Sequence, residues 1–296
     1  MRAACFKALL LGCCLALLQG CAVRLAYNNA DRLVAWQASE YVDLDRGQRA
    51  WLRARVKRIV FWHRREQLPE WAAALRRFEL ALDDEAGGQE LQALIVEGER
   101  WSDELSEQFL PTLVDLLLAL DEDQREDLPE TFAERNAEWN EDYEGLDDAA
   151  QRRVWQDEMR EGLDDWVGAL NSMQNEALVR AAADVVPDNS AWISYRERWQ
   201  GVVMDALREG QDASALTATL RSLMLDRERW YTPEYARARA INDVVYQRFT
   251  LELLAHLDTR QHRKLSRRVR GLAEDFEALA AQSGDAPEDP GPAPRR

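Results

Sequence analysis

The 296-residue sequence has few of the residues that catalytic and metal sites need. Its only histidines, His63, His256 and His262, lack the i, i+4 spacing of a zinc-binding helix. There is also no Gly-x-Ser-x-Gly sequence, no glycine-rich phosphate loop and no dinucleotide fingerprint. We therefore expect no metal site, no cofactor and no enzymatic activity.

Cysteine is confined to the N-terminal end, at positions 5, 13, 14 and 21. Arg2 and Lys7 precede an apolar run that ends in Leu18-Gln19-Gly20-Cys21. The run is shorter than the roughly 20 residues of a membrane-spanning helix, and this order is typical of a bacterial lipoprotein signal peptide. We expect residues 1–20 to be removed and Cys21 to be acylated, so that no thiol remains for a disulfide or a metal.

The residue after Cys21 bears on the location of the protein. It is Ala22, whereas an aspartate there resembles the inner-membrane retention signal of enteric lipoproteins. We therefore expect a lipid anchor in the bacterial outer membrane, on its periplasmic face. The membrane is then the first partner. Both this location and the net charge of −16 argue against nucleic acid as another.

Charge is segregated along the chain. Residues 97–165 contain 24 acidic and 6 basic side chains, whereas residues 45–77 contain ten basic and three acidic ones. The acidic stretch is expected to be a solvated helical face, in part paired with the basic segments. Residues 45–66 predict a basic amphipathic helix. It either packs in the ordinary way or faces the membrane through Arg49, Arg53, Lys57 and Arg64.

Apolar residues recur at helical spacing, as in Leu216, Leu220 and Leu223, and strand alternation is nearly absent. This predicts an all-α, elongated bundle of about nine or ten helices over residues 21–280. A division into two helical subdomains near residues 184–190 is an alternative. Residues 281–296 contain four prolines and are expected to be disordered.

Proline positions refine these boundaries. Three Pro-Glu steps begin at Pro69, Pro129 and Pro233, and proline followed by an acid is typical of a helix start. Pro111 differs because it lies within a long apolar pattern, where it predicts a kink or a break.

One motif, Leu-Asp-x-x-Gln-x-x-x-Leu, occurs three times and again in degenerate form at Asp148–Gln151. Its spacing is that of a capping box, in which Asp accepts from the backbone N–H three residues later and Gln bonds back to the Asp N–H. The three repeats therefore predict helix starts capped by the following pairs: Asp45 and Gln48, Asp121 and Gln124, and Asp258 and Gln261.

These repeats resemble the Leu-Thr-x-x-Gln motif of Spy/CpxP-like periplasmic proteins, with Asp in place of Thr. That resemblance implies an all-helical envelope protein that binds unfolded clients. The segments Cys21–Asp31, Tyr41–Gln48 and Trp62–Pro69 also resemble an uncharacterised family of proteobacterial helical lipoproteins. This second resemblance implies a fold and a location without an activity.

The sequence thus predicts an anchored envelope protein that binds other proteins, as a chaperone-like or scaffold component, in an oligomeric state that it does not indicate. Two alternatives stay open. One is a hydrolase acting on peptidoglycan or lipid through two carboxylates, for which Glu134, Glu138 and Asp142 are candidates. The other is a lipid-binding shuttle, which needs an apolar cavity between helices.

Overall fold

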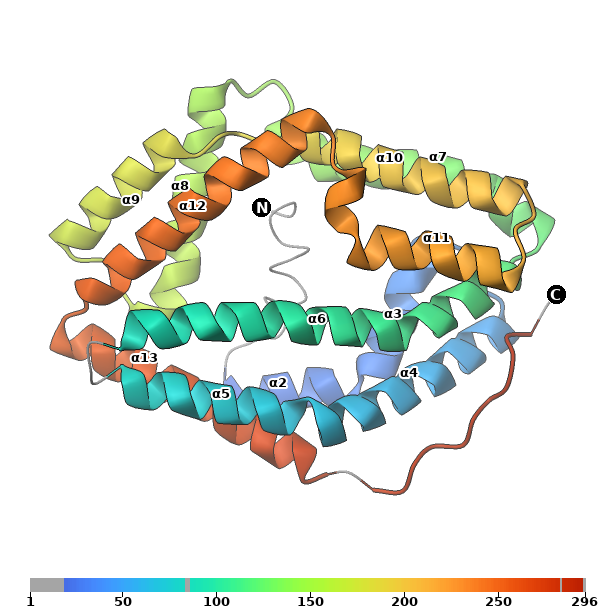
Figure 1. The fold of residues 1–296 in the computed structure, drawn as a ribbon, viewed down its shortest axis with the longest axis horizontal. Coiled ribbons are helices and arrows are strands. Elements are labelled where there is room, and N and C mark those ends of the chain that lie inside the picture. Colours follow the sequence, from blue (N-terminus) through green and yellow to red (C-terminus); the bar gives the residue numbers. More distant parts are fainter. Residues whose placement is uncertain (1–18, 83–85, 283, 295–296) are drawn as a thin grey trace.

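The computed structural model describes residues 19–82, 86–282 and 284–294, and this part of the chain is all-α, with no strand. It contains twelve α-helices, a few more than the sequence predicts, and two short 3-10 helices (Figure 1). The elements are α2 (Gln19–Asn28), α3 (Ala30–Ser39), α4 (Arg46–Glu66), α5 (Leu68–Ala81), α6 (Gly87–Leu118), α7 (Glu122–Asn140), η1 (Glu141–Tyr143), α8 (Asp148–Val167), α9 (Ser172–Asp184), α10 (Asn189–Arg208), α11 (Ala213–Leu225), η2 (Arg227–Trp230), α12 (Pro233–Ala255) and α13 (Thr259–Ala280).

The helices bury three apolar clusters. The largest joins α3, α4, α6, α7, α10 and α11, and its Leu220 is fully buried. The second packs α5 against α13, with Phe78 and Phe276 on its two sides. The third joins α9 to α12 around Leu178. Figure 1 shows α6 running along the length of the molecule, with α5 on one side and α11 on the other.

Two of the three Pro-Glu steps begin helices as predicted. Pro69 lies in the first turn of α5, and Pro233 opens α12 behind a Thr232 cap. The expectation for Pro129 is wrong, because the cap at Asp121 starts α7 two turns earlier and the helix continues through the proline. Helix α6 likewise runs through Pro111 without a break.

Glycines with a positive φ follow α8 and α10. Gly210, at φ +64°, joins α10 to α11, and residues 185–188 join α9 to α10. A positive φ strains any residue with a β-carbon, which explains the glycine after α10. The corresponding exit from α8 is Gly168, at φ +82°.

Both ends of the described chain contact the folded body. Helix α2 packs on α13, whereas residues 1–18 of the expected signal peptide lie outside the described residues. The C-terminal segment runs along α4, where Trp51 Nε1 donates to the Gly291 carbonyl at 2.8 Å and Arg58 donates to that of Pro287 at 2.8 Å. Among the described residues, no helix combines the length and apolar character that crossing a membrane requires.

Candidate functional site

The repeated capping boxes meet in the interior. Gln48 and Gln124 are 0% and 3% exposed, and their side-chain amides hydrogen-bond to each other in both directions, at 3.0 and 2.7 Å. Each Oε1 also accepts from the N–H of its own cap, Asp45 or Asp121. We call such a mutually bonded pair of capping-box glutamines a glutamine bracket.

A second glutamine bracket joins α9 to α13. Gln174 and Gln261, also buried, exchange the same two hydrogen bonds at 3.0 and 2.7 Å. Asp258 caps α13 as the sequence predicts, but its partner box is capped by Asn171, which the aspartate-based motif missed. The sequence around Asn171 reads Leu-Asn-x-x-Gln-x-x-x-Leu, and admitting asparagine, an equally good N-cap, finds it.

The degenerate repeat at Asp148–Gln151 is not a capping box. Asp147, one residue earlier, caps α8 through the Ala150 N–H at 2.8 Å. Gln151 instead donates to the Leu146 carbonyl within the same turn. The fourth box of the fold is therefore the one at Asn171.

The two brackets share a further contact. Each glutamine Nε2 donates to the carbonyl that lies two residues before its partner's cap. The four carbonyls are those of Ala119, Asp43, His256 and Ala169, at 2.7–3.2 Å. Every donor and acceptor of the four amides is therefore used within the fold, and the brackets are structural joints with no polar atom left for a ligand.

The four basic residues singled out on α4 all have contacts within the fold. Arg53 Nε lies 3.0 Å from a carboxylate oxygen of the buried Asp31, and Lys57 Nζ lies 4.0 Å from the same oxygen. Arg64 donates to Asn28 at 2.5 Å, and Arg49 donates to the Leu44 carbonyl at 3.0 Å. Three of the four thus bind the α2–α3 segment, beside position 21, which lies within α2.

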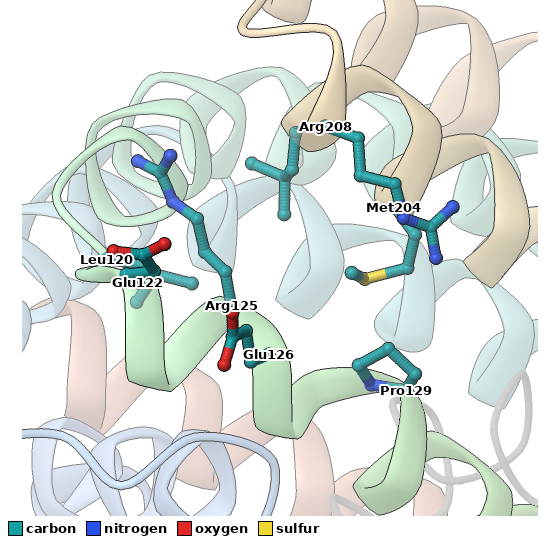
Figure 2. A pocket seen from close by; sticks show the side chains of 8 residues that line it. Leu120, Glu122, Arg125, Glu126, Pro129, Met204 and Arg208 are labelled. Carbon is teal, nitrogen blue, oxygen red and sulfur yellow. The ribbon is translucent and has the colours of Figure 1, made fainter.

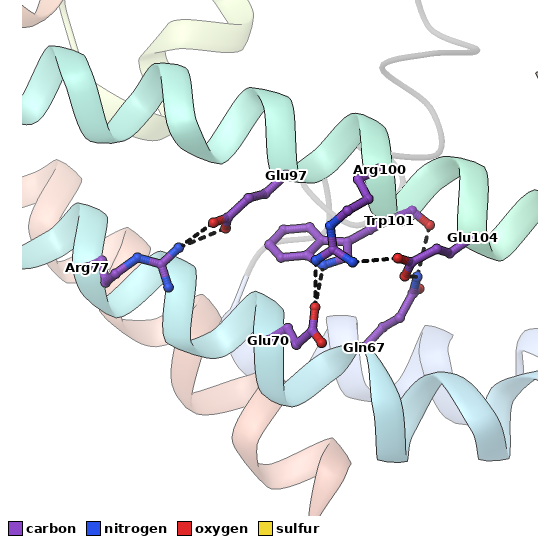
Figure 3. Close-up of polar contacts among 7 residues, drawn as sticks. All are labelled: Gln67, Glu70, Arg77, Glu97, Arg100, Trp101 and Glu104. Atoms are coloured by element: carbon purple, nitrogen blue, oxygen red, sulfur yellow. Dashed lines mark hydrogen bonds and ion pairs between the residues drawn. The ribbon is translucent and has the colours of Figure 1, made fainter.

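Helices α5 and α6 are joined by polar contacts (Figure 3). Glu70 accepts from Arg100 at 2.7 Å and from Trp101 Nε1 at 2.9 Å, and these bonds hold its pKa below the usual range. Buried Gln67 donates to the Trp101 carbonyl at 3.0 Å, and Arg77 binds Glu97 at 2.8 Å. The beginning of the acidic stretch is therefore paired with α5.

The three carboxylates considered for a hydrolase are exposed and lie along α7 and η1: Glu134, Glu138 and Asp142. The buried carboxylates, in contrast, bind arginine. Asp275 accepts from Arg24 at 2.7 Å, and Glu79 accepts from Arg270 at 2.6 Å. Within the described residues, no three His, Cys, Asp or Glu side chains converge as metal ligands.

The N-terminal half of α12 contributes to a cluster of titratable groups that sequence reasoning did not find. Tyr195 and Tyr235 stack with ring centroids 5.1 Å apart, and Tyr231 meets both rings edge-on. Burial raises the pKa of Tyr195 to about 12 and also raises that of Asp188, a carboxyl close to Asn242. Tyr195 lies on α10 and Asp188 directly precedes that helix, whereas Tyr231 follows η2 and Tyr235 lies in the first turn of α12, so no local sequence pattern joins the two groups.

An open pocket of about 620 Å³ lies between the start of α7 and the end of α10 (Figure 2). It combines apolar residues from both sides with four charged ones. The lining residues are Leu120, Glu122, Arg125, Glu126, Pro129, Met204, Leu207 and Arg208. Figure 2 shows Arg125 on one side of the pocket and Arg208 on the other, with Met204 beside Arg208 and Pro129 below Met204. We call this pocket the α7–α10 groove.

Comparison with known proteins gives a family and no activity. Searches of the curated proteins and of the solved structures each found no match. A family model described as a family of unknown function, DUF6279, matches residues 40–236, which are 197 of the 296 residues. That match contains the first glutamine bracket, the α7–α10 groove and the tyrosine cluster. The chain therefore belongs to the DUF6279 family.

Proposed function

We propose that this protein is a lipid-anchored component of the bacterial envelope whose folded body binds other proteins, as a chaperone or a scaffold. The anchor part of the proposal rests on the residues up to Cys21 and on Ala22, which favour the periplasmic face of the outer membrane. The resemblance of the repeats to Spy/CpxP-like proteins supports a chaperone-like role.

The α7–α10 groove is the single observation that carries protein binding. Its apolar lining combines the exposed Pro129 with the edges of core side chains such as Met204, which is 6% exposed, and suits one small apolar side chain of a partner. Arginine and glutamate at its rim suit polar or charged flanking residues of either sign. Because the groove is open, it fits a protruding segment of a polypeptide better than an enclosed small molecule.

The first glutamine bracket supports this proposal because it positions one wall of the groove. Leu120 and Glu122, which line the groove, flank the cap at Asp121. Gln124, one turn further, is bonded to Gln48 and to the Asp43 carbonyl. The wall is thus fixed by buried hydrogen bonds, and a rigid surface binds with a smaller loss of conformational entropy.

The test combines a client assay with site-specific photo-crosslinking. A photo-reactive amino acid is placed at Glu126, on the groove, and separately at Glu138, another exposed glutamate of α7 that lies outside it. We expect the acylated protein in nanodiscs to suppress aggregation of a chemically denatured envelope protein, and residue 126 to crosslink to it much more than residue 138. Absence of suppression together with equal crosslinking at both positions refutes the proposal.

One observation favours a second candidate, the carboxylate-dependent hydrolase. Burial raises the pKa of Asp188, as a general acid requires, against the opposing effects of Arg239 and a hydrogen bond with Asn242, and the carboxylate of Asp243 makes a smaller contribution in the same direction as burial. Asp243 itself is bound to Arg239 at 2.8 Å. The test measures the release of fragments from purified peptidoglycan or phospholipid. Release by the wild type and by Glu134→Gln, together with its loss in Asp188→Asn, would favour this candidate over protein binding alone.

A further inference from the structure

Helices α2 and α3 leave large apolar side chains in solvent. Leu25 is 66% exposed, Leu33 is 48% exposed and Trp36 is 61% exposed. These three lie within twelve residues, directly after position 21. Leu25 is one helical turn beyond that position on the same helix, which corresponds to a rise of about 6 Å.

This segment is fixed to the folded body and is therefore not a loose tether. Arg24 binds the buried carboxylate of Asp275 on α13 at 2.7 Å. The Tyr27 hydroxyl and His63 Nδ1 on α4 are 2.7 Å apart. Asp31 at the start of α3 binds Arg53 of α4. A surface that contacts the apolar residues of α2 and α3 consequently sets the orientation of the whole molecule.

The charges around the segment indicate which surface fits. Helix α4, which packs on α3, places Arg53, Lys57 and Arg64 against the α2–α3 segment. Arg32 is itself exposed beside Leu33, and Lys57 is 58% exposed. Apolar side chains set among basic groups match a bilayer that contains anionic phospholipids.

We propose that Leu25, Leu33 and Trp36 form a membrane-docking surface that inserts into the headgroup region of an anionic phospholipid bilayer. Tryptophan is enriched at this depth of a membrane because its ring is apolar and its N–H is polar. The proposal rests on the proposed acylation of Cys21, since the anchor holds this surface within reach of the lipid. A second contact beside the acyl chains then holds the α7–α10 groove at one orientation to the bilayer.

The experiment exploits the expected absence of any other free thiol in the acylated protein. Two variants are compared: Leu33→Cys and, as a control of similar exposure (51%), Ile95→Cys on α6. Each is labelled with an environment-sensitive fluorophore and reconstituted into phosphatidylcholine vesicles with or without phosphatidylglycerol. On vesicles with phosphatidylglycerol, we expect emission at position 33 to shift to the blue and to be quenched by lipid-borne bromine, with little change at position 95. Arg32→Glu in the Leu33→Cys background is expected to reduce this quenching.

The outcomes separate docking from anchoring. Flotation of both proteins with the vesicles, with equal and weak quenching at positions 33 and 95, overturns the docking surface and leaves the anchor intact. Failure to float overturns the anchor on which docking rests. If the protein sediments as a dimer and the label at position 33 is already shielded without lipid, a second copy of the chain covers this face. That result overturns the proposal that the face binds the membrane.

Discussion

The first glutamine bracket provides the sharpest test of the fold. The substitution Gln48→Met keeps the approximate volume of the side chain and removes its amide. Four hydrogen bonds are lost: those with the Asp45 N–H and the Ala119 carbonyl, and both bonds with Gln124. Since Gln48 is fully buried, water does not readily replace them.

The expected cost follows from the groups left without partners. The Ala119 carbonyl and one donor of the Gln124 amide belong to residues that are each 3% exposed. A buried polar group without a partner costs about 1–3 kcal/mol, so these two predict a loss of about 2–6 kcal/mol in the free energy of unfolding. Gln124→Met, at the other half of the bracket, should cost about the same.

A double-mutant cycle separates the bracket from two independent caps. The Gln48→Met/Gln124→Met protein loses the two mutual bonds only once, so its destabilisation should fall short of the sum of the single effects by about 1–2 kcal/mol. Urea denaturation followed by circular dichroism measures all three. As a matched control, Gln151→Met removes a glutamine that bonds only the nearby Leu146 carbonyl, and it should cost less than about 1 kcal/mol. Additive effects at positions 48 and 124, or losses no larger than the control's, would refute the bracket.

Two further predictions concern the attachment of α2. Burial lowers the pKa of His63 to about 4, whereas in the unfolded chain it titrates near 6.5. As the pH falls from 6.5 to 4, only the unfolded state gains a proton on His63, so the free energy of unfolding decreases by about 3 kcal/mol over this range. The free energy of unfolding of His63→Phe, measured by denaturation over the same range, should depend less on pH. Asp275→Ala removes the buried partner of Arg24 and should cost about 2 kcal/mol. Hydrogen exchange should then speed up in the amides of α2 more than in those of α11, and equal protection of α2 in both proteins would contradict the attachment.

The all-α class was predictable because helical periodicity and capping are local properties of the sequence. The three aspartate boxes are confirmed at the predicted residues, since a cap depends on a residue and the three that follow it. Pro129 shows the limit of local reasoning. A proline with an acid next to it suits a helix start, but the box at Asp121 begins α7 first and the helix absorbs the proline.

Pairing of the boxes was beyond the sequence. Four boxes allow three ways of pairing, and each glutamine offers the same donors and acceptors. Which boxes pair therefore depends on how the long helices α6 and α12 bring distant parts of the chain together. The tyrosine cluster was hidden for the same reason, because Tyr195 comes from α10, whereas Tyr231 and Tyr235 lie beyond α11. The α7–α10 groove likewise joins residues about 80 positions apart, such as Arg125 and Met204.

Among the four capping boxes, Asn171 is the one cap that is not aspartate, and its environment explains the difference. Its Oδ1 accepts from the Gln174 N–H at 3.1 Å, as an aspartate would. Its Nδ2 donates to the His256 carbonyl at 2.8 Å, a bond that a carboxylate cannot make. Asn171→Asp therefore keeps the cap but sets a negative charge against a carbonyl oxygen, and it should cost about 1–2 kcal/mol at neutral pH.

The loss should shrink once the new carboxyl is protonated, because a protonated acid donates again. Asp258→Asn, at the other cap of the same bracket, is the matched control. Asp258 Oδ1 accepts from the Arg260 and Gln261 N–H groups, and these bonds need only an acceptor at the cap, so asparagine should be tolerated there. Denaturation at pH 7 and at pH 4 measures both variants. Equal tolerance of the two exchanges at pH 7 would show that the donor of Asn171 does not contribute, and the second bracket would then rest on its glutamines alone.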